Sequence, residues 1–286
     1  MKHAERILNI LMFTFLYAPL LVMMFFSFNA SSSTSVFTGF SLKWYRILFA
    51  DEDGSIRSAL MYSIALAVLS SLIATLIGTV AALGLMKFKR KSIRNTVITV
   101  TNIPMVNPDI VTAVSLVLLF SAILTIFSLE ISDFLSLLIA HITFNLPYVI
   151  LSVMPKIKQM DPSLTEAAMD LGCTPAKAFF KVELPQIMPG IFSGMIMAFT
   201  MSFDDFVISH FTAGNIETLP LKIYSMTGKG SVTPDMYALS TFMMVAILCM
   251  LILSNVVQSK DEISKAKQLK KMRRAKKSAA SGSTNV

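Results

Sequence analysis

The chain has 286 residues, of which 54% are apolar and only 15% charged, and its mean hydropathy is +0.67. A soluble domain of ordinary composition carries about 25% charged residues, so these values exclude a soluble enzyme and a disordered chain. The formal charge of +8 does not by itself indicate a nucleic-acid partner. We therefore expect an all-α, polytopic membrane protein that lies in a lipid bilayer and binds no nucleic acid.

Six apolar runs are long enough to cross a membrane, which takes about 20 residues. They lie at roughly Ile7–Phe28, Ala59–Leu85, Thr96–Phe127, Phe134–Met154, Ile187–Ile208 and Met236–Val257. The first run could be a cleaved signal peptide, because Lys2 and Arg6 precede it. Its apolar stretch is longer than the usual signal core and ends without a clear small-residue cleavage site, so we interpret it as a retained helix.

The basic residues predict the topology. They gather before the first run and in the loops after the second, fourth and sixth runs, most densely at Lys87–Arg94, Lys156–Lys181 and Lys260–Lys277. The opposite loops hold only Lys43, Arg46, Arg57, Lys222 and Lys229. Because basic loops stay in the cytoplasm, both termini are expected there. We divide the chain into a six-span domain, residues 1–258, and a basic, partly disordered tail, residues 259–286.

Two apolar runs contain acidic residues. Asp109 follows the helix-breaking segment Asn102–Pro108 in the third run, and Asp204 and Asp205 lie in the fifth. Charges within a membrane are costly and indicate function, and backbone broken at that depth must line protein or a wet cavity. These carboxylates, with Phe203 and Phe206 as cation–π partners, form a candidate pathway for a cationic substrate.

Neighbouring residues on a helix point about 100° apart, so Asp204 and Asp205 cannot both face one pore. One of them could instead cap a helix end, bond a neighbouring helix or meet a partner subunit. His141 and Asn145 in the fourth run are expected to form hydrogen bonds between helices. The scattered His and Cys residues indicate neither a metal site nor a disulfide.

The loop between the fourth and fifth runs carries clear helix signals. Asp161 is suited to cap a helix that begins at Pro162, and Gly172 is suited to the left-handed position after its end. A second short helix should open at Thr174-Pro175 and stop before Pro185. The first helix has one apolar stripe, formed by Leu164, Ala167, Ala168 and Leu171. This stripe either packs on the chain's own helix ends or docks into a groove of a partner.

This loop resembles the EAA signature of ATP-binding-cassette (ABC) importer permeases. The matching residues are Glu166, Ala167, Ala168, Gly172, Val182, Leu184 and Pro185, with Val182 where isoleucine is usual. The resemblance implies a type I ABC importer permease fold whose coupling helices, within residues 161–185, contact a separate ATPase. No phosphate-binding G-x-x-x-x-G-K-[ST] motif occurs in the sequence. We therefore expect a transport subunit without catalytic residues or bound cofactors, with ATP and Mg²⁺ held by the ATPase.

Further segments are similar to spermidine/putrescine permease subunits, in particular the C-type subunit. They are Ile103–Met105, Pro108–Val111, Ala198–Ser209, Leu219–Met226 and Thr233–Asp235. The resemblance implies a bacterial inner or plasma membrane and, as partners, a second permease, two copies of the ATPase and an extracellular polyamine-binding protein. The alternatives are an ABC permease for another cation or small solute, a secondary transporter and an intramembrane enzyme. The adjacent Asp204 and Asp205 do not offer the facing carboxylates of an aspartyl dyad.

Overall fold

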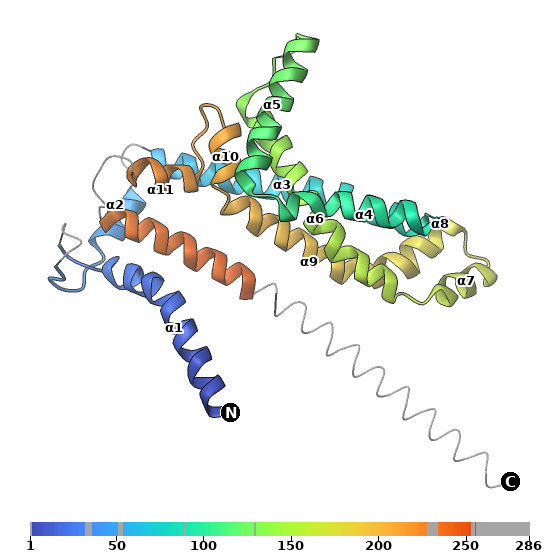
Figure 1. Cartoon of the computed structure of the whole chain (residues 1–286), viewed down its shortest axis with the longest axis horizontal. Helices are drawn as coiled ribbons and strands as arrows, with labels where there is room; N and C mark the ends of the chain where they lie inside the picture. The colour runs from blue at the N-terminus through green and yellow to red at the C-terminus, as the bar shows by residue number, and fades with distance from the viewer. Residues whose placement is uncertain are drawn as a thin grey trace, which may run out of the picture. The chain divides into compact units, whose positions relative to one another are not determined.

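The computed structural model describes residues 2–31, 36–50, 54–88, 90–128, 130–227, 234–252 and 255. Within these ranges the regular elements are helices, with one isolated bridge between Asn29 and Phe40. Six helices are long and apolar enough to cross a membrane, as predicted (Figure 1). They are Glu5–Phe26, Ser55–Lys87, Asp109–Phe127, Asp133–Gln159, Pro175–Phe203 and Pro234–Ile252.

The helices are numbered in chain order. They are α1 (Lys2–Phe26), α2 (Lys43–Ala50), α3 (Ser55–Lys87), α4 (Lys91–Val106), α5 (Asp109–Phe127), α6 (Asp133–Gln159), α7 (Pro162–Asp170), α8 (Pro175–Ala178), the π-helix η1 (Phe179–Glu183), α9 (Leu184–Phe203), α10 (Val207–Thr212) and α11 (Leu219–Thr227). The predicted basic tail, residues 259–286, lies outside the described residues.

The third apolar run is broken, as its sequence predicted, and the break falls at Asn107-Pro108. Asn107 has extended backbone angles (φ −78°, ψ 140°), because the ring of Pro108 disfavours the helical conformation in the residue before it. Pro104 does not interrupt the chain, since it lies within α4. The spanning helix therefore begins at Asp109 and not at Thr96.

The fifth apolar run differs from the prediction, which treated it as one continuous helix to Ile208. Helix α9 ends at Phe203, and α10 begins at Val207. Asp204 and Asp205 thus lie in a break between two helices. The carboxylate of Asp205 accepts hydrogen bonds from the backbone N–H groups of Ile208 and Ser209, which starts a new helix in place of continuing the old one.

The prediction that the second coupling helix stops before Pro185 is wrong. Helices α8, η1 and α9 follow one another without an interruption, from Pro175 to Phe203. Pro185 is the second residue of α9 and lies inside this continuous run, where a proline removes one backbone hydrogen bond. The wide π turn ahead of it is closed by a hydrogen bond from Leu184 N–H to the carbonyl oxygen of Phe179.

The chain forms two compact units by its internal contacts. The first, which we call the gate unit, consists of the described residues within 1–66, 109–140 and 203–248; the second, the lever unit, consists of the described residues within 67–108, 141–202 and 249–255. The boundary between the units crosses helices α3, α6 and α9. Each of these three long helices therefore contributes one part to each unit.

The core of the lever unit is formed by three helices, α3, α6 and α9. Its buried residues are Ala74, Ala82, Leu85, Val149, Ile150, Val153, Met154, Ile157, Ile187 and Ala198. Glycines allow these helices to approach closely: a Cβ atom at Gly78 would lie 2.7 Å from Val149 Cγ1, and one at Gly194 would lie 3.2 Å from Val149 Cα. Small residues are typical of tightly packed membrane helices.

A buried hydrogen-bond chain joins the same three helices. Ser70 Oγ donates to Ser202 Oγ at 2.9 Å, and Ser202 Oγ lies 3.2 Å from His141 Nδ1. The expected interhelical role of His141 is thereby confirmed. Asn145 is also fully buried, but among the described residues its side-chain amide has no hydrogen-bond partner. The interhelical bond predicted for Asn145 is therefore absent from the described residues.

Candidate functional site

The predicted pathway residues Asp109, Phe203, Asp204, Asp205 and Phe206 all belong to the gate unit. They lie at two helix breaks, one ahead of α5 and one between α9 and α10. Helix α10, which follows Asp204 and Asp205, packs against α5, which begins at Asp109 (Figure 1). The fold thus brings together carboxylates that are almost 100 residues apart in the sequence.

The two neighbouring carboxylates have different environments. Asp205 is partly buried, and its two oxygens accept backbone hydrogen bonds from Ser209 at 2.8 Å and Ile208 at 3.3 Å. It therefore caps α10, which is one of the alternatives left open by the sequence. Asp204 is exposed. Of the pair, Asp204 is the carboxylate with a surface that a cation can reach.

The two predicted aromatic residues also differ. Phe203 is only 2% exposed and belongs to the core, so a ligand cannot reach its ring in this conformation. Phe206 is half-buried and lies 4.7 Å from Tyr224 and 5.3 Å from His210, measured between ring centroids. Sequence reasoning missed both neighbours. The i, i+4 spacing of Phe206 and His210 was a usable signal, whereas Tyr224 comes from α11 and only the tertiary structure places it there.

Polar contacts on the gate unit fix the segments that follow α10. The carboxylate of Asp133 accepts hydrogen bonds from the backbone N–H of Asn215 at 2.9 Å and from its side-chain amide at 3.1 Å. Gly214 has a φ of +56° and lies directly against the Asp133 carboxylate, which leaves no room for a side chain. The turn after α10 is thereby held at the start of α6.

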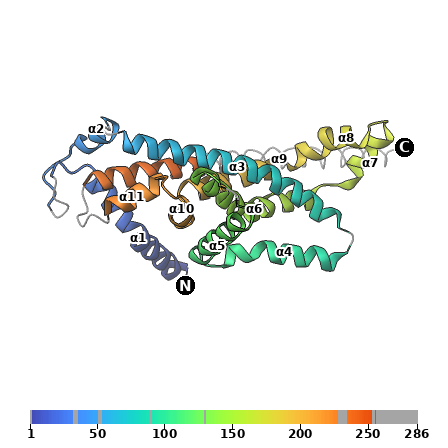
Figure 2. The ribbon, with the colours of Figure 1, turned by 90° about the horizontal axis from the view of Figure 1, so that it is seen from above.

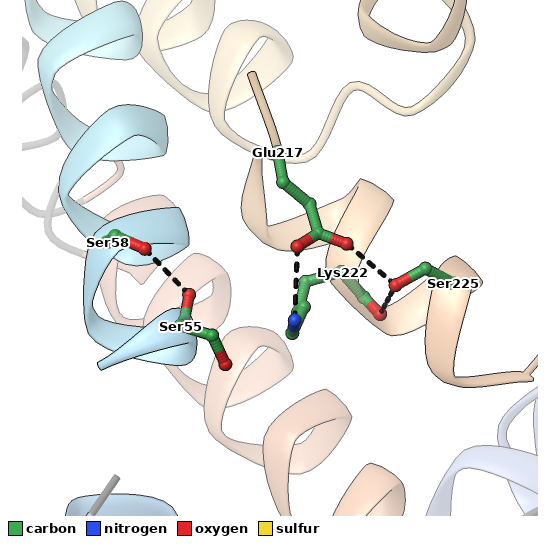
Figure 3. A network of polar contacts seen from close by, with 5 residues as sticks. All are labelled: Ser55, Ser58, Glu217, Lys222 and Ser225. Atoms are coloured by element: carbon green, nitrogen blue, oxygen red, sulfur yellow. Dashed lines mark hydrogen bonds and ion pairs between the residues drawn. The ribbon is translucent and has the colours of Figure 1, made fainter. Parts of the chain in front are cut away.

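Helix α11 is positioned by a second set of contacts. Glu217 forms an ion pair with Lys222 at 3.1 Å and accepts a hydrogen bond from Ser225 Oγ at 2.7 Å (Figure 3). In addition, the backbone N–H of Leu219 donates to Ser63 Oγ in α3 at 2.7 Å. These contacts set the direction of α11 and with it the position of Tyr224.

The coupling loop has the capping pattern that its sequence predicted. Asp161 accepts a hydrogen bond from the backbone N–H of Ser163 at 3.0 Å, and the Ser163 hydrogen bonds hold the pKa of this exposed carboxyl below its usual value. Gly172 has a φ of +85°, and Thr174 Oγ1 accepts a hydrogen bond from Lys177 N–H at 3.4 Å. Helices α7 and α8 lie together at the end of α9 (Figure 2).

The EAA-like residues lie in this hairpin, at Glu166–Gly172, and in the helical segment after it, at Val182–Pro185. Glu166, Ala167, Gly172 and Pro185 are exposed, while Ala168, Val182 and Leu184 are half-buried. In the apolar stripe of α7, Leu164 is 49% and Leu171 is 87% exposed. Among the described residues, the ends of the chain's other helices leave these two leucines exposed, so the structure does not show the stripe packed against them. An exposed apolar stripe on a capped helix is instead suited to a partner's groove.

Residues 74–260 match one protein family, described as "Binding-protein-dependent transport system inner membrane component". The putrescine transport system permease protein PotI of Escherichia coli K12 is 39% identical over 243 residues, which cover 84% of this chain and 85% of that protein. The spermidine/putrescine permease PotC of the same strain is 37% identical over 246 residues, covering 86% and 90%. A PotC homolog of Mycoplasma genitalium is 31% identical and covers 94% and 99%.

Solved structures support the fold. A chain from a bacterial ABC transporter that imports alginate has a TM-score of 0.67 at 18% identity and covers 90% of this chain and 94% of its own length. A chain of the MetNI methionine ABC transporter has a TM-score of 0.59 at 16% identity, covering 73% and 98%. Both are ABC transporters, which confirms the predicted ABC importer permease fold; at these identities they bear on fold alone.

Proposed function

The chain belongs to the family of binding-protein-dependent transport system inner membrane components, and we propose that it forms half of the pore of an ATP-driven polyamine importer. The relatives with 37–39% identity are named as putrescine and spermidine/putrescine permeases. The observation that carries the substrate class is the packing of α5, which begins with an aspartate, against α10, which follows an acidic helix break, within the gate unit. Asp109 stands at one, and Asp204 and Asp205 stand at the other.

A polyamine is a flexible chain of ammonium groups separated by methylenes. It needs carboxylates spaced along its route and apolar or aromatic walls between them. Helices α5, α9 and α10 contain no Lys or Arg, so no fixed positive charge on these helices opposes a cation. A small number of charged groups suits such a route, because tighter binding would prevent release of the cargo. These features favour a cation over an anionic or neutral solute.

The assembly is inferred from the family. Its name states dependence on a binding protein, and ABC importers use a separate ATPase as their source of energy. In the proposed complex this chain pairs with a second permease subunit, two copies of the ATPase and an extracellular polyamine-binding protein. This chain then binds no cofactor of its own, and ATP and Mg²⁺ belong to the ATPase.

The proposed contact with the ATPase is the exposed hairpin of α7, Gly172 and α8 together with the helical segment that follows it. Its residues are Glu166, Ala167, Ala168, Gly172, Val182, Leu184 and Pro185. Because α8, η1 and α9 are continuous, they form a run of 29 residues, about 43 Å long at 1.5 Å per residue. A movement of the hairpin is thus carried along the backbone to the break at Asp204. Closure of the ATPase on ATP would in this way alter access to the carboxylates.

The proposed orientation follows from the basic loops. Lys87, Arg90, Lys91 and Arg94 lie at the end of α3 and the start of α4, and Lys156 and Lys158 lie at the end of α6. Basic loops remain in the cytoplasm. Both termini, the coupling hairpin and the tail of residues 259–286 are therefore placed in the cytoplasm of a bacterial cell, with residues 1–258 in and around the inner membrane. The break at Asp204, at the far end of α9, is then placed toward the outer side.

Uptake of labelled spermidine and putrescine tests this proposal, in cells that lack their own polyamine importers and express the complete transporter. We expect ATP-dependent uptake, reduced at least tenfold by Asp204→Asn, because the substitution removes the reachable charge and keeps the shape. Glu130→Gln is the matched control, since Glu130 is an exposed acid outside the site, and it should transport normally.

Three outcomes separate the alternatives. An assembled complex that takes up no polyamine would refute the substrate class and leave a permease for another cation or small solute. Uptake that continues without ATP, by a chain that does not co-purify with an ATPase, would indicate a secondary transporter. Uptake that is equal in Asp204→Asn and wild type would retain the substrate and move the charge requirement to Asp109 or the second permease.

A further inference from the structure

Three aromatic rings lie next to the break at Asp204 and Asp205. Phe206 and His210 come from the start of α10, and Tyr224 comes from α11; all three belong to the gate unit. The centroid of the Phe206 ring is 5.3 Å from that of His210 and 4.7 Å from that of Tyr224, and His210 and Tyr224 are 5.8 Å apart. Each ring thus contacts the other two.

Helices α10 and α11 contact each other through this cluster, and that contact covers the rings only in part. The side chains that α10 buries are Ile208, Ser209 and Thr212. Of the three rings, Phe206 is half-buried, His210 is exposed and Tyr224 is 55% exposed. The rings therefore present accessible surface to a ligand.

The chemistry of the accessible surface favours a cation. The face of an aromatic ring carries negative electrostatic potential and attracts an ammonium group placed above it. Asp204, also exposed, precedes Phe206 by two residues and adds a full negative charge at the same break. Methylene groups between two ammonium groups can pack against the rings, which a site made of carboxylates alone would not allow.

We propose that Phe206, His210 and Tyr224 form an aromatic binding site for the ammonium and methylene groups of the transported polyamine, next to the carboxylate of Asp204. The inference rests on the proposed function, since it requires a polyamine as cargo. It assigns binding residues to two positions, His210 and Tyr224, that the sequence motifs did not indicate, and it removes the buried Phe203 from the site. A cation–π contact is weaker than a buried ion pair, so the site holds the cargo without trapping it.

The first test replaces Tyr224 by leucine in the complete transporter, reconstituted in lipid vesicles with saturating polyamine-loaded binding protein. The site must draw the cargo from the binding protein, so losing one cation–π contact should lower the rate of spermidine uptake by about 3- to 30-fold. Tyr62→Leu is the matched control: Tyr62 lies on α3, is 44% exposed and has a ring neighbour, Phe134, at 6.5 Å. We expect no change in this variant.

The second test separates binding from a structural role. Phenylalanine carrying zero, one, two or three fluorine atoms is incorporated at position 224, because fluorine weakens the potential of the ring face and hardly changes its size. The uptake rate should fall stepwise with each fluorine atom. This series also tests whether the ring at position 224 binds the cation if the Tyr224→Leu transporter does not assemble.

Each outcome has one meaning. A stepwise decline, with Tyr62→Leu unchanged, supports the aromatic site. If the wild type takes up polyamine normally and the uptake rate is the same for all members of the fluorine series, the aromatic site is refuted and the proposed function stands. The same holds if Tyr62→Leu loses as much uptake as Tyr224→Leu. Absence of spermidine and putrescine uptake by the assembled wild-type transporter refutes the proposed function itself, and the aromatic site with it.

Discussion

The lever unit and the gate unit are held together by different kinds of contact. The lever unit buries long, continuous stretches of α3, α6 and α9 against one another, with glycines at the closest approaches. The gate unit instead contains the break between α9 and α10 and the short helices α10 and α11, held by side-chain caps and polar contacts. A dense core resists deformation, whereas a capped break can change its backbone angles at little cost. The comparison indicates where a transporter can transmit movement and where it can open.

The largest expected effect is on the packing of the lever unit. Gly78→Leu places a side chain where even a Cβ would lie 2.7 Å from Val149 Cγ1. Overpacking of this kind costs about 1–3 kcal/mol or more, so the purified complex should lose at least several degrees of thermal stability. Gly84→Leu is the control on the same helix, because nothing lies within 4 Å of its Cβ position. Equal stability of the two variants would contradict the close approach of α3 and α6.

The next effect concerns the hairpin at the start of the lever. Gly172 has a φ of +85° and open space around its Cβ position, so only its backbone conformation restricts substitution. Gly172→Val should strain the turn by about 1–2 kcal/mol and uncouple ATP hydrolysis from uptake while the protein still inserts. ATPase activity and uptake, measured on the same vesicles, check this expectation.

Asparagine provides the control at this position, because it adopts left-handed backbone conformations more readily than other side chains do. Gly172→Asn should therefore keep most of the coupling. If Gly172→Val transports as well as Gly172→Asn, the turn does not act as a rigid part of the lever.

The coupling hairpin could be predicted from the sequence almost residue by residue, since its signals are local. Asp161, Gly172 and Thr174 each act on backbone groups within a few residues of themselves. The end of the second helix was predicted wrongly, because the helix continues past Pro185 through a π turn that has no comparable sequence signal. Local sequence signals were therefore sufficient to predict the helix caps, but they did not predict that α8 continues into α9.

The gate could be predicted only in part. The sequence indicated the break at Asn107-Pro108 and singled out the three aspartates, because a proline and an acidic residue within an apolar run can be recognised from the sequence alone. It did not indicate that α9 ends at Phe203, since Asp205 starts α10 through contacts that compete with a continuing helix. Nor could it place Tyr224 beside Phe206, because these residues belong to different helices. The roles proposed for these residues in transport stay predictions.

The smallest expected effect concerns Asp205, and it distinguishes a role as a helix cap from a role as a negative charge for the cargo. Asp205 accepts two backbone hydrogen bonds at the start of α10, and replacing such a cap by alanine costs about 0.5–2 kcal/mol. Asp205→Ala should therefore lower thermal stability modestly and reduce uptake. Asparagine caps a helix about as well as aspartate does, so Asp205→Asn should retain both stability and most of the uptake, in contrast to Asp204→Asn.

These two asparagine variants together separate the roles of the neighbouring carboxylates. Both remove one negative charge from the same break, so any general effect of charge on the assembled pore is equal in the two. Loss of uptake in Asp205→Asn without loss of stability would mean that the capping carboxylate also meets the cargo, and that the gate opens by releasing the start of α10. Retained uptake would assign the charge requirement to Asp204 and leave α10 as the fixed wall that holds the aromatic rings.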